Sequence, residues 1–154
     1  MRKSIKFRTL IALVTALVFI SACKKDEVPE GSNYTTKLSG LVKAELDLTN
    51  ATTEFAPIGT RITFLINPND LQMNPDTAAN YDSYRYTTTV LAEGKYTIEL
   101  PAKNVGSMVK IVMDDFEYQT VYVGGTTQRK IYKGDPTETT IYAGTAKIMD
   151  LFYQ

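Results

Sequence analysis

The chain has 154 residues, 17 of them basic and 17 acidic, with one cysteine and no histidine. This length suits a short targeting segment followed by one domain. The absence of histidine removes the commonest general base near neutral pH and the commonest transition-metal ligand. Ser-His and Cys-His nucleophilic sites and ordinary zinc sites are therefore excluded, and carboxylate chemistry or calcium remains.

The first 22 residues have the layout of a secretory signal. A cationic head with four basic side chains precedes an apolar run, Leu10–Ile20, and the small residues Ser21 and Ala22 stand directly before Cys23. The 14 uncharged residues from Thr9 to Ala22 would span about 21 Å as a helix, less than the roughly 30 Å of a hydrocarbon core. We therefore predict a signal peptide over 1–22. The alternative, a buried thiol in a core helix, leaves the basic head unexplained.

The run Ile20-Ser21-Ala22-Cys23 resembles the lipobox of bacterial lipoproteins. The resemblance implies that Cys23 is acylated, for example with palmitate, and becomes the N-terminus of a membrane-anchored protein. The following Lys24–Glu27 resembles the charged tract of surface-exported Bacteroidetes lipoproteins. It implies an outer-membrane, lipid-anchored location, with surface exposure favoured over a periplasm-facing position. The same residues would serve equally well as a solvated tether.

The segment after the cysteine predicts a spacer, because residues 28–36 are rich in Pro, Gly, Ser, Asn and Thr and have no apolar period. We assign 23–36 to the acylated cysteine and a flexible tether. Four of the 17 basic residues lie in the signal, so residues 23–154 carry 13 basic and 17 acidic side chains and a net charge of −4. A mildly acidic domain without a basic cluster is not expected to bind nucleic acid.

From Lys37 to the end of the chain the pattern is that of β-strands. The alternation is cleanest in two stretches, with Ile62, Phe64 and Ile66 on one face of the first, and Tyr96, Ile98 and Leu100 on one face of the second. No 11-residue window after the cysteine has a convincing helical period. The expected strands lie at 38–48, 60–66, 84–91, 95–101, 108–113, 116–123, 127–133, 138–142 and 145–153. The sequence therefore predicts an all-β antiparallel sandwich of seven to nine strands over 37–154.

Four segments, 39–42, 56–64, 87–90 and 94–101, together resemble the carboxypeptidase-regulatory-like modules, which are transthyretin-like (prealbumin-like) sandwiches. Gly94 stands where a glycine turn joins two strands. The resemblance covers about 38–123 and implies a structural, stabilising or interaction role without catalysis, so we expect no enzyme and no cofactor. The chain departs from the family at Leu91–Gly94, where the usual acidic turn is missing, and in the long insertion 67–83.

The 67–83 loop is the expected place for a glycan or protein partner, because long loops on a rigid sandwich are often functional. Tyr81, Tyr84 and Tyr86 are candidate ligand-binding residues, and the alternative is that they are ordinary strand tyrosines. Thr77 is a candidate O-glycosylation site, since Asp76-Thr77-Ala78 resembles the short acceptor motif of Bacteroidetes exported proteins.

Two acidic sets are weaker candidates for calcium, and we predict no metal site. These are Asp114, Asp115 and Glu117, which would be solvated acids at a strand turn, and Asp70, Asp76 and Asp82, which are too widely spaced for an EF-type loop. The sequence favours a lipoprotein with a non-catalytic binding or structural role. The alternative is a subunit of a surface fibre or outer-membrane complex that assembles by β-strand addition. The oligomeric state is left open.

Overall fold

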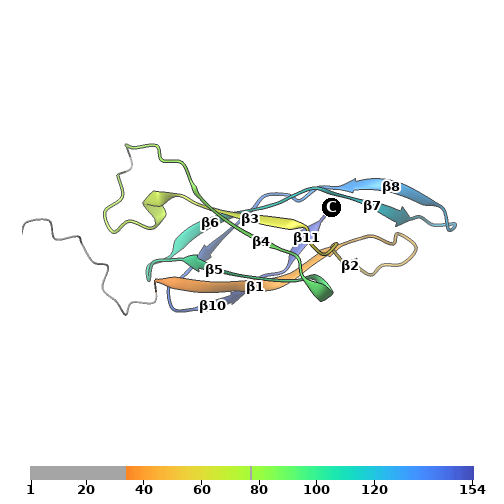
Figure 1. The fold of residues 1–154 in the computed structure, drawn as a ribbon, viewed down its shortest axis with the longest axis horizontal. Helices are drawn as coiled ribbons and strands as arrows, with labels where there is room; N and C mark the ends of the chain where they lie inside the picture. Colours follow the sequence, from red (N-terminus) through yellow and green to blue (C-terminus); the bar gives the residue numbers. More distant parts are fainter. Residues whose placement is uncertain (1–33, 77) are drawn as a thin grey trace, which may run out of the picture. The chain divides into compact units, whose positions relative to one another are not determined.

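The computed structural model describes residues 34–76 and 78–154 (Figure 1). The predicted signal peptide, Cys23, the tether up to residue 33 and Thr77 lie outside the described residues. Within them the chain forms β-strands and two short 3-10 turns, and no helix reaches the length and hydrophobicity that crossing a membrane requires.

The strands follow one another with short connections, except for the long segment between β3 and β4. They are β1 (Thr35–Ala44), β2 (Glu54–Phe55), β3 (Arg61–Ile66), β4 (Tyr84–Thr89), β5 (Lys95–Pro101), β6 (Ser107–Met113), β7 (Phe116–Val121), β8 (Thr127–Tyr132), β9 (Thr137–Ile141), β10 (Ala146–Ile148) and β11 (Leu151–Tyr153). The 3-10 turns are η2 (Pro68–Asp70) and η3 (Ala92–Gly94). All nine expected strands are present. The two additional ones arise because β2 forms and because the expected strand 145–153 is divided into β10 and β11.

The first sheet is built around β1, which begins three residues before the start of the expected strand 38–48 and ends four residues before its end. Strand β5 pairs with it antiparallel, with Leu38 opposite Ile98, and β2 pairs antiparallel beside its last two residues. On the other side β10 and then β11 pair with β1 in parallel. This mixed pairing was not predicted. It is possible because the two short strands come at the end of the chain, far from β1, and need no hairpin to reach it.

The second sheet is wholly antiparallel, in the order β4-β3-β6-β9. Its inner face meets the inner face of the first sheet, and side chains of both form one core, with the rings of Phe64 and Tyr96 centred 6.2 Å apart. The largest fully buried side chains are Tyr96, Tyr132, Phe64, Leu38, Ile62, Ile66, Leu100, Ile111, Ile141, Val42, Val90 and Val109. The prediction of an all-β sandwich built mainly from antiparallel strands is confirmed, and the parallel pairing of β10 and β11 with β1 is the exception.

The predicted inward faces of two strands can be compared directly with burial. In β3, Ile62, Phe64 and Ile66 are fully buried, as the alternation predicts. In β5, Tyr96 and Leu100 are buried, whereas Ile98 is only partly buried and packs against the core from the margin. Strand β5 lies at the edge of its sheet, with β1 on one side of it. Fewer core side chains therefore reach Ile98, in the middle of its inner face. Leu100 is therefore the deeper of the two aliphatic positions.

Strands β7 and β8 form a separate hairpin that is attached to the sandwich at its base (Figure 1). There Phe116 stacks on Tyr132 at 5.2 Å and meets Tyr153 edge-on at 4.7 Å. The Tyr132 hydroxyl, which is buried, donates to the Glu45 carbonyl at 2.6 Å and lies 2.7 Å from the Thr120 hydroxyl. These contacts satisfy the polar end of a buried ring and hold the hairpin in place.

Candidate functional site

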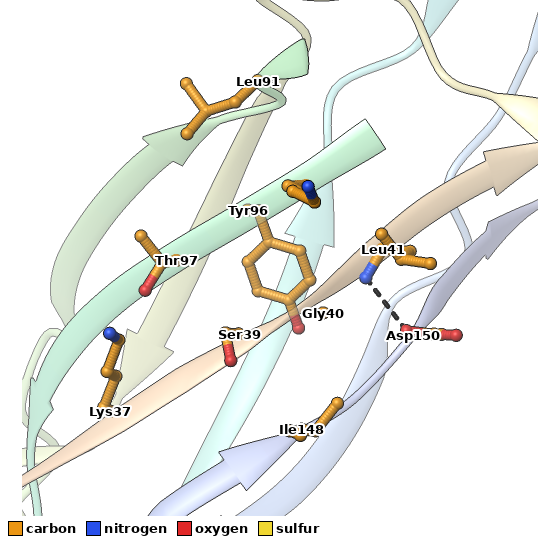
Figure 2. Close-up of a pocket in the computed structure, with 10 residues that line it drawn as sticks. Lys37, Ser39, Gly40, Leu41, Leu91, Tyr96, Thr97, Ile148 and Asp150 are labelled. Atoms are coloured by element: carbon orange, nitrogen blue, oxygen red, sulfur yellow. Dashed lines mark hydrogen bonds between the residues drawn. The ribbon is translucent and has the colours of Figure 1, made fainter. Parts of the chain in front are cut away.

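A hollow with a volume of about 630 Å³ lies on the outer face of the first sheet, within the usual range for ligand sites. Strands β1, β5 and β10 and the turn before β5 supply its walls (Figure 2). Its lining residues are Lys37, Ser39, Gly40, Leu41, Leu91, Lys95, Tyr96, Thr97, Ile148 and Asp150.

The floor of the hollow depends on Gly40. A Cβ atom at this position would lie 1.9 Å from the carbonyl oxygen of Met149, which is far inside van der Waals contact. Met149 is one of the two residues between β10 and β11, and its N–H donates to the Ser39 carbonyl at 2.8 Å. The backbone of Met149 thus occupies the space that a side chain on β1 would need, and only glycine fits there.

The pairing with β1 is interrupted at Met149 and Asp150, between β10 and β11. Two side-chain hydrogen bonds replace the backbone bonds that the sheet loses there. The Tyr96 hydroxyl donates to the Met149 carbonyl at 2.7 Å. The carboxylate of Asp150 accepts from the Leu41 N–H at 2.9 Å, as Figure 2 shows. Burial raises the pKa of the Tyr96 hydroxyl, and the negative charge of Asp150 adds to this effect. Tyr96 therefore stays protonated and remains a donor at neutral pH.

The walls of the hollow combine apolar side chains with lysines at the rim. Leu91 and Ile148 keep 49% and 81% of their surface exposed, although both are aliphatic. Lys95 forms an ion pair with Glu93, whereas Lys37 takes part in none of the ion pairs between described residues. The arrangement suits an elongated apolar ligand with an anionic group near Lys37, because such a ligand would cover the aliphatic surface and complement the charge.

A smaller hollow of about 220 Å³, which is below the usual size of a ligand site, lies beyond the same interruption. Its lining includes Met149 and Asp150 together with Asp135, Pro136 and Phe152. Asp150 thus lines both hollows. Its carboxylate has a structural role, because it accepts the hydrogen bond from the Leu41 N–H.

The three candidate tyrosines lie elsewhere. Tyr84 and Tyr86 are on the same face of β4, opposite Ile66 and Phe64 of β3, so they continue the core row to the margin of the sheet. Tyr86 packs against the core, and Tyr84 is half exposed. Tyr81 lies in the preceding loop and also keeps part of its ring exposed. None of the three lines either hollow, and their role in ligand binding stays a prediction.

The 67–83 loop has two parts with different environments. Its first part is packed: Pro68 is buried, Leu71 contacts the core, and the Asp70 carbonyl accepts from the buried Ser107 hydroxyl at 2.9 Å. The Lys103 ammonium also donates to the Gln72 carbonyl at 3.1 Å. Most of the described residues after position 72 are exposed. The candidate acceptor Thr77 belongs to this part but lies outside the described residues.

The acidic candidates for calcium are not gathered into a site. Asp114 lies 3.8 Å from the Arg61 guanidinium, and the Asp76 carboxylate accepts from the N–H of Ala78. In 34–76 and 78–154, no three side chains of the types that bind metals are grouped so that they could hold an ion.

Sequence reasoning missed the hollow, since its residues come from segments that are far apart in the chain. One signal was present in the expected strand 145–153. Ile148 stands an odd number of positions before Leu151 and Tyr153, so in one continuous strand it would lie on the opposite face from these two buried side chains. A change of phase of this kind within one short apolar segment indicates an interrupted strand.

A scan against protein-family models and a search of curated proteins both gave no match. The solved structures to which the chain is similar include the following two. One is the shaft pilin SpaA from Lactobacillus rhamnosus GG, with a TM-score of 0.46 and 12% identity over 77% of this chain and 49% of the pilin, so the chain spans about half the pilin's length. The other is the major plantain pollen allergen Pla l 1, with a TM-score of 0.40 and 18% identity over 77% of this chain and 92% of the allergen. Neither likeness is close enough to support an argument about function.

Proposed function

We propose that this chain is a membrane-anchored lipoprotein whose sandwich domain binds a ligand without catalysing a reaction. The observation that carries the proposal is the hollow on the outer face of the first sheet, where exposed aliphatic side chains stand next to Lys37. The resemblance to the carboxypeptidase-regulatory-like modules supports the same non-catalytic role.

The anchor would be the acylated Cys23. Two or three acyl chains hold a protein stably, because each buried methylene contributes about 0.8 kcal/mol. Changing Cys23 to Ser should block acylation and processing and leave a longer precursor that labelled palmitate does not enter. Labelling of the Cys23→Ser protein would refute the anchor. Protease treatment of intact cells tests the outer-membrane location, since a surface-exposed domain is digested and a periplasm-facing domain is protected.

The ligand would be an elongated amphipathic anion, for which dodecanoate is a suitable probe. Titration of residues 24–154 with dodecanoate should give saturable binding that is weaker for Lys37→Glu by about fivefold or more, because the charge at the rim is reversed. Lys110→Glu is the matched control, since Lys110 is an exposed lysine on β6, outside the hollow. Equal affinities for the two variants would exclude Lys37 from the site.

The apolar wall can be tested in the same assay. Ile148→Asn should weaken binding, whereas Ile131→Asn, at an exposed isoleucine on the β7–β8 hairpin, should not. Dodecyltrimethylammonium has the same chain with a cationic head group, and it should bind more weakly than dodecanoate. If the dissociation constant changes neither with the charge of the head group nor with Ile148→Asn, the proposed site is refuted.

The glycan or protein partner expected at 67–83, and glycosylation of Thr77, remain part of this proposal. Intact-mass analysis of the protein from its own host decides the modification, since a glycan adds a discrete mass that Thr77→Ala removes. An unmodified native protein would refute glycosylation and leave the loop as a contact surface.

A second candidate function is assembly by β-strand addition in a surface fibre or outer-membrane complex. The observation that favours it is the position of β4 at the end of the second sheet, where β3 is its only strand partner among the described residues. Concentration-dependent polymers of the purified protein would support this function, and a monomer at all concentrations would contradict it.

A further inference from the structure

Strand β4 pairs with β3 along one edge, and among the described residues no backbone hydrogen bond is made along its other edge, although its Thr88 hydroxyl donates to the Thr97 carbonyl of β5 at 3.0 Å. The backbone N–H of Val90 donates to the Thr60 carbonyl at 2.9 Å, and Val90 accepts from Gly59 at 2.8 Å. Successive residues of an antiparallel strand direct their N–H and C=O groups to opposite sides. The even-numbered residues of β4 therefore face β3, and the backbone groups of Arg85, Thr87 and Thr89 face away from it.

Two of the other sheet margins, at β9 and at β5, are partly covered. At β9, the Lys147 ammonium reaches across from β10 and donates to the Thr140 carbonyl at 3.0 Å and to the Thr139 hydroxyl. At β5, the carbonyl of Lys95 accepts from the Leu91 N–H at 2.7 Å. A lysine placed over a sheet edge is a common protection against pairing with another chain.

The free edge of the β7–β8 hairpin is protected by charge. Strand β8 carries two basic residues at successive positions, Arg129 and Lys130, on opposite faces. Arg129 is paired with Glu117 at 3.1 Å, and a second copy of β8 that placed Lys130 opposite Lys130 would bring like charges together. Strand β4 has no such protection, since its six residues include no Pro, no Gly and one charge, that of Arg85. The strand order places β4 at the end of its sheet, and Figure 1 shows that the long loop leads directly into it.

We propose that β4 pairs antiparallel with β4 of a second copy of this chain, across a two-fold axis. Because only odd-numbered residues offer free backbone groups, hydrogen-bonded pairs must join odd to odd. Pairing Arg85 with Arg85 would oppose like charges. Two registers avoid this. Arg85 opposite Thr89 forms six backbone hydrogen bonds, whereas Arg85 opposite Thr87 forms four and also puts Tyr86 opposite Tyr86 in a close aromatic pair, so we assign the second.

This register also explains the incomplete burial of the tyrosine row. Tyr84 lies on the inner face in line with the fully buried Ile66, yet 52% of its surface is exposed. A strand added beyond β4 extends the sheet over this margin and covers the ring. The interface is isologous and closes after two copies, so it produces a dimer and not a fibre.

The test is sedimentation of the full chain, extracted in detergent, over a wide concentration range. The wild-type protein and Thr87→Val should dimerise. Thr87→Pro should remain monomeric with an unchanged melting temperature, because the lost N–H faces the partner and not β3. A wild-type monomer at the highest concentration, or a Thr87→Pro dimer as stable as the wild type, would overturn the inference.

Charge variants keep the backbone donor and test the register. Thr87→Glu places a carboxylate opposite Arg85 of the second copy, and Thr87→Arg places a like charge there. Two such pairs form per dimer, so the dissociation constant should fall with Glu and rise with Arg by roughly two- to thirtyfold. Equal constants would refute the register. Open polymers would support strand addition as a function and refute the closed dimer, and none of these outcomes affects ligand binding in the hollow.

Discussion

Replacing Gly40 by Ala should disrupt the junction between the first sheet and the end of the chain. The new methyl group would lie 1.9 Å from the Met149 oxygen and 2.6 Å from its carbonyl carbon. Contacts below 3.0 Å essentially never occur for a Cβ atom, and both atoms belong to the backbone, which cannot rotate away as a side chain can. The segment 148–150 must therefore move away from β1.

The cost can be worked out from the bonds that this movement breaks. Three hydrogen bonds hold the segment: Met149 to Ser39, Tyr96 to Met149, and Leu41 to Asp150. Each net hydrogen bond contributes about 1 kcal/mol, so breaking the three bonds costs about 3 kcal/mol, which agrees with the upper end of the range of about 1–3 kcal/mol for overpacking. For a domain of this size this loss lowers the melting temperature by roughly 12 °C.

Thermal unfolding followed by circular dichroism measures this loss. Ser39→Ala is the control, because it changes the neighbouring residue on the outer face and needs no extra space. Gly40→Ala should also abolish dodecanoate binding if the hollow is the site, since its floor is displaced. A Gly40→Ala protein that melts within about 2 °C of the Ser39→Ala control, well below the shift expected from overpacking, would refute the close approach of Met149 to β1.

Three further predictions concern the core, the pH dependence and the loop. Leu100→Asp should cost more than about 3 kcal/mol because it buries a carboxylate, and Thr97→Asp on the outer face should change the melting temperature little; equal losses would refute the inward and outward assignment. Burial raises the pKa of Tyr96 and Tyr153 in the folded state above the ordinary value of 10.0. Their contribution to the free energy of unfolding is therefore complete below pH 10 and is lost as the pH rises above it. In urea titrations, a variant with both replaced by Phe should lose less stability between neutral and alkaline pH than the wild type. Replacing 73–82 by a short Gly-Ser linker should leave the domain folded in a thermal melt, because loop closure costs little and the packed residues before position 73 remain; an unfolded variant would show that the removed part belongs to the core.

Much of the local structure follows from the sequence alone. The alternation in 60–66 and 95–101 places side chains on two faces with a period of two, and the strands form where the pattern predicts them. The turn at Gly94 is equally local: its φ of +67° is a conformation that glycine adopts without strain. The alternation and the turn conformation depend on neighbours in the chain, so the local sequence suffices to predict them, whereas the close approach of Phe55 and Val42 to Gly94 comes from distant segments.

The tertiary structure decided the features that depend on segments far apart in the chain. The parallel pairing of β1 with β10 and β11, the interruption at Met149 and the hollow beside it require contacts across more than 100 residues. The alternation of apolar and polar residues along the chain does not determine which strands pair with each other. The packing of 67–72 was missed for the same reason, since Ser107 and the core that accept this segment are formed by later strands. Local pattern sets which face of a strand is apolar, whereas only the assembled sheets determine which strand covers it and which edge stays open.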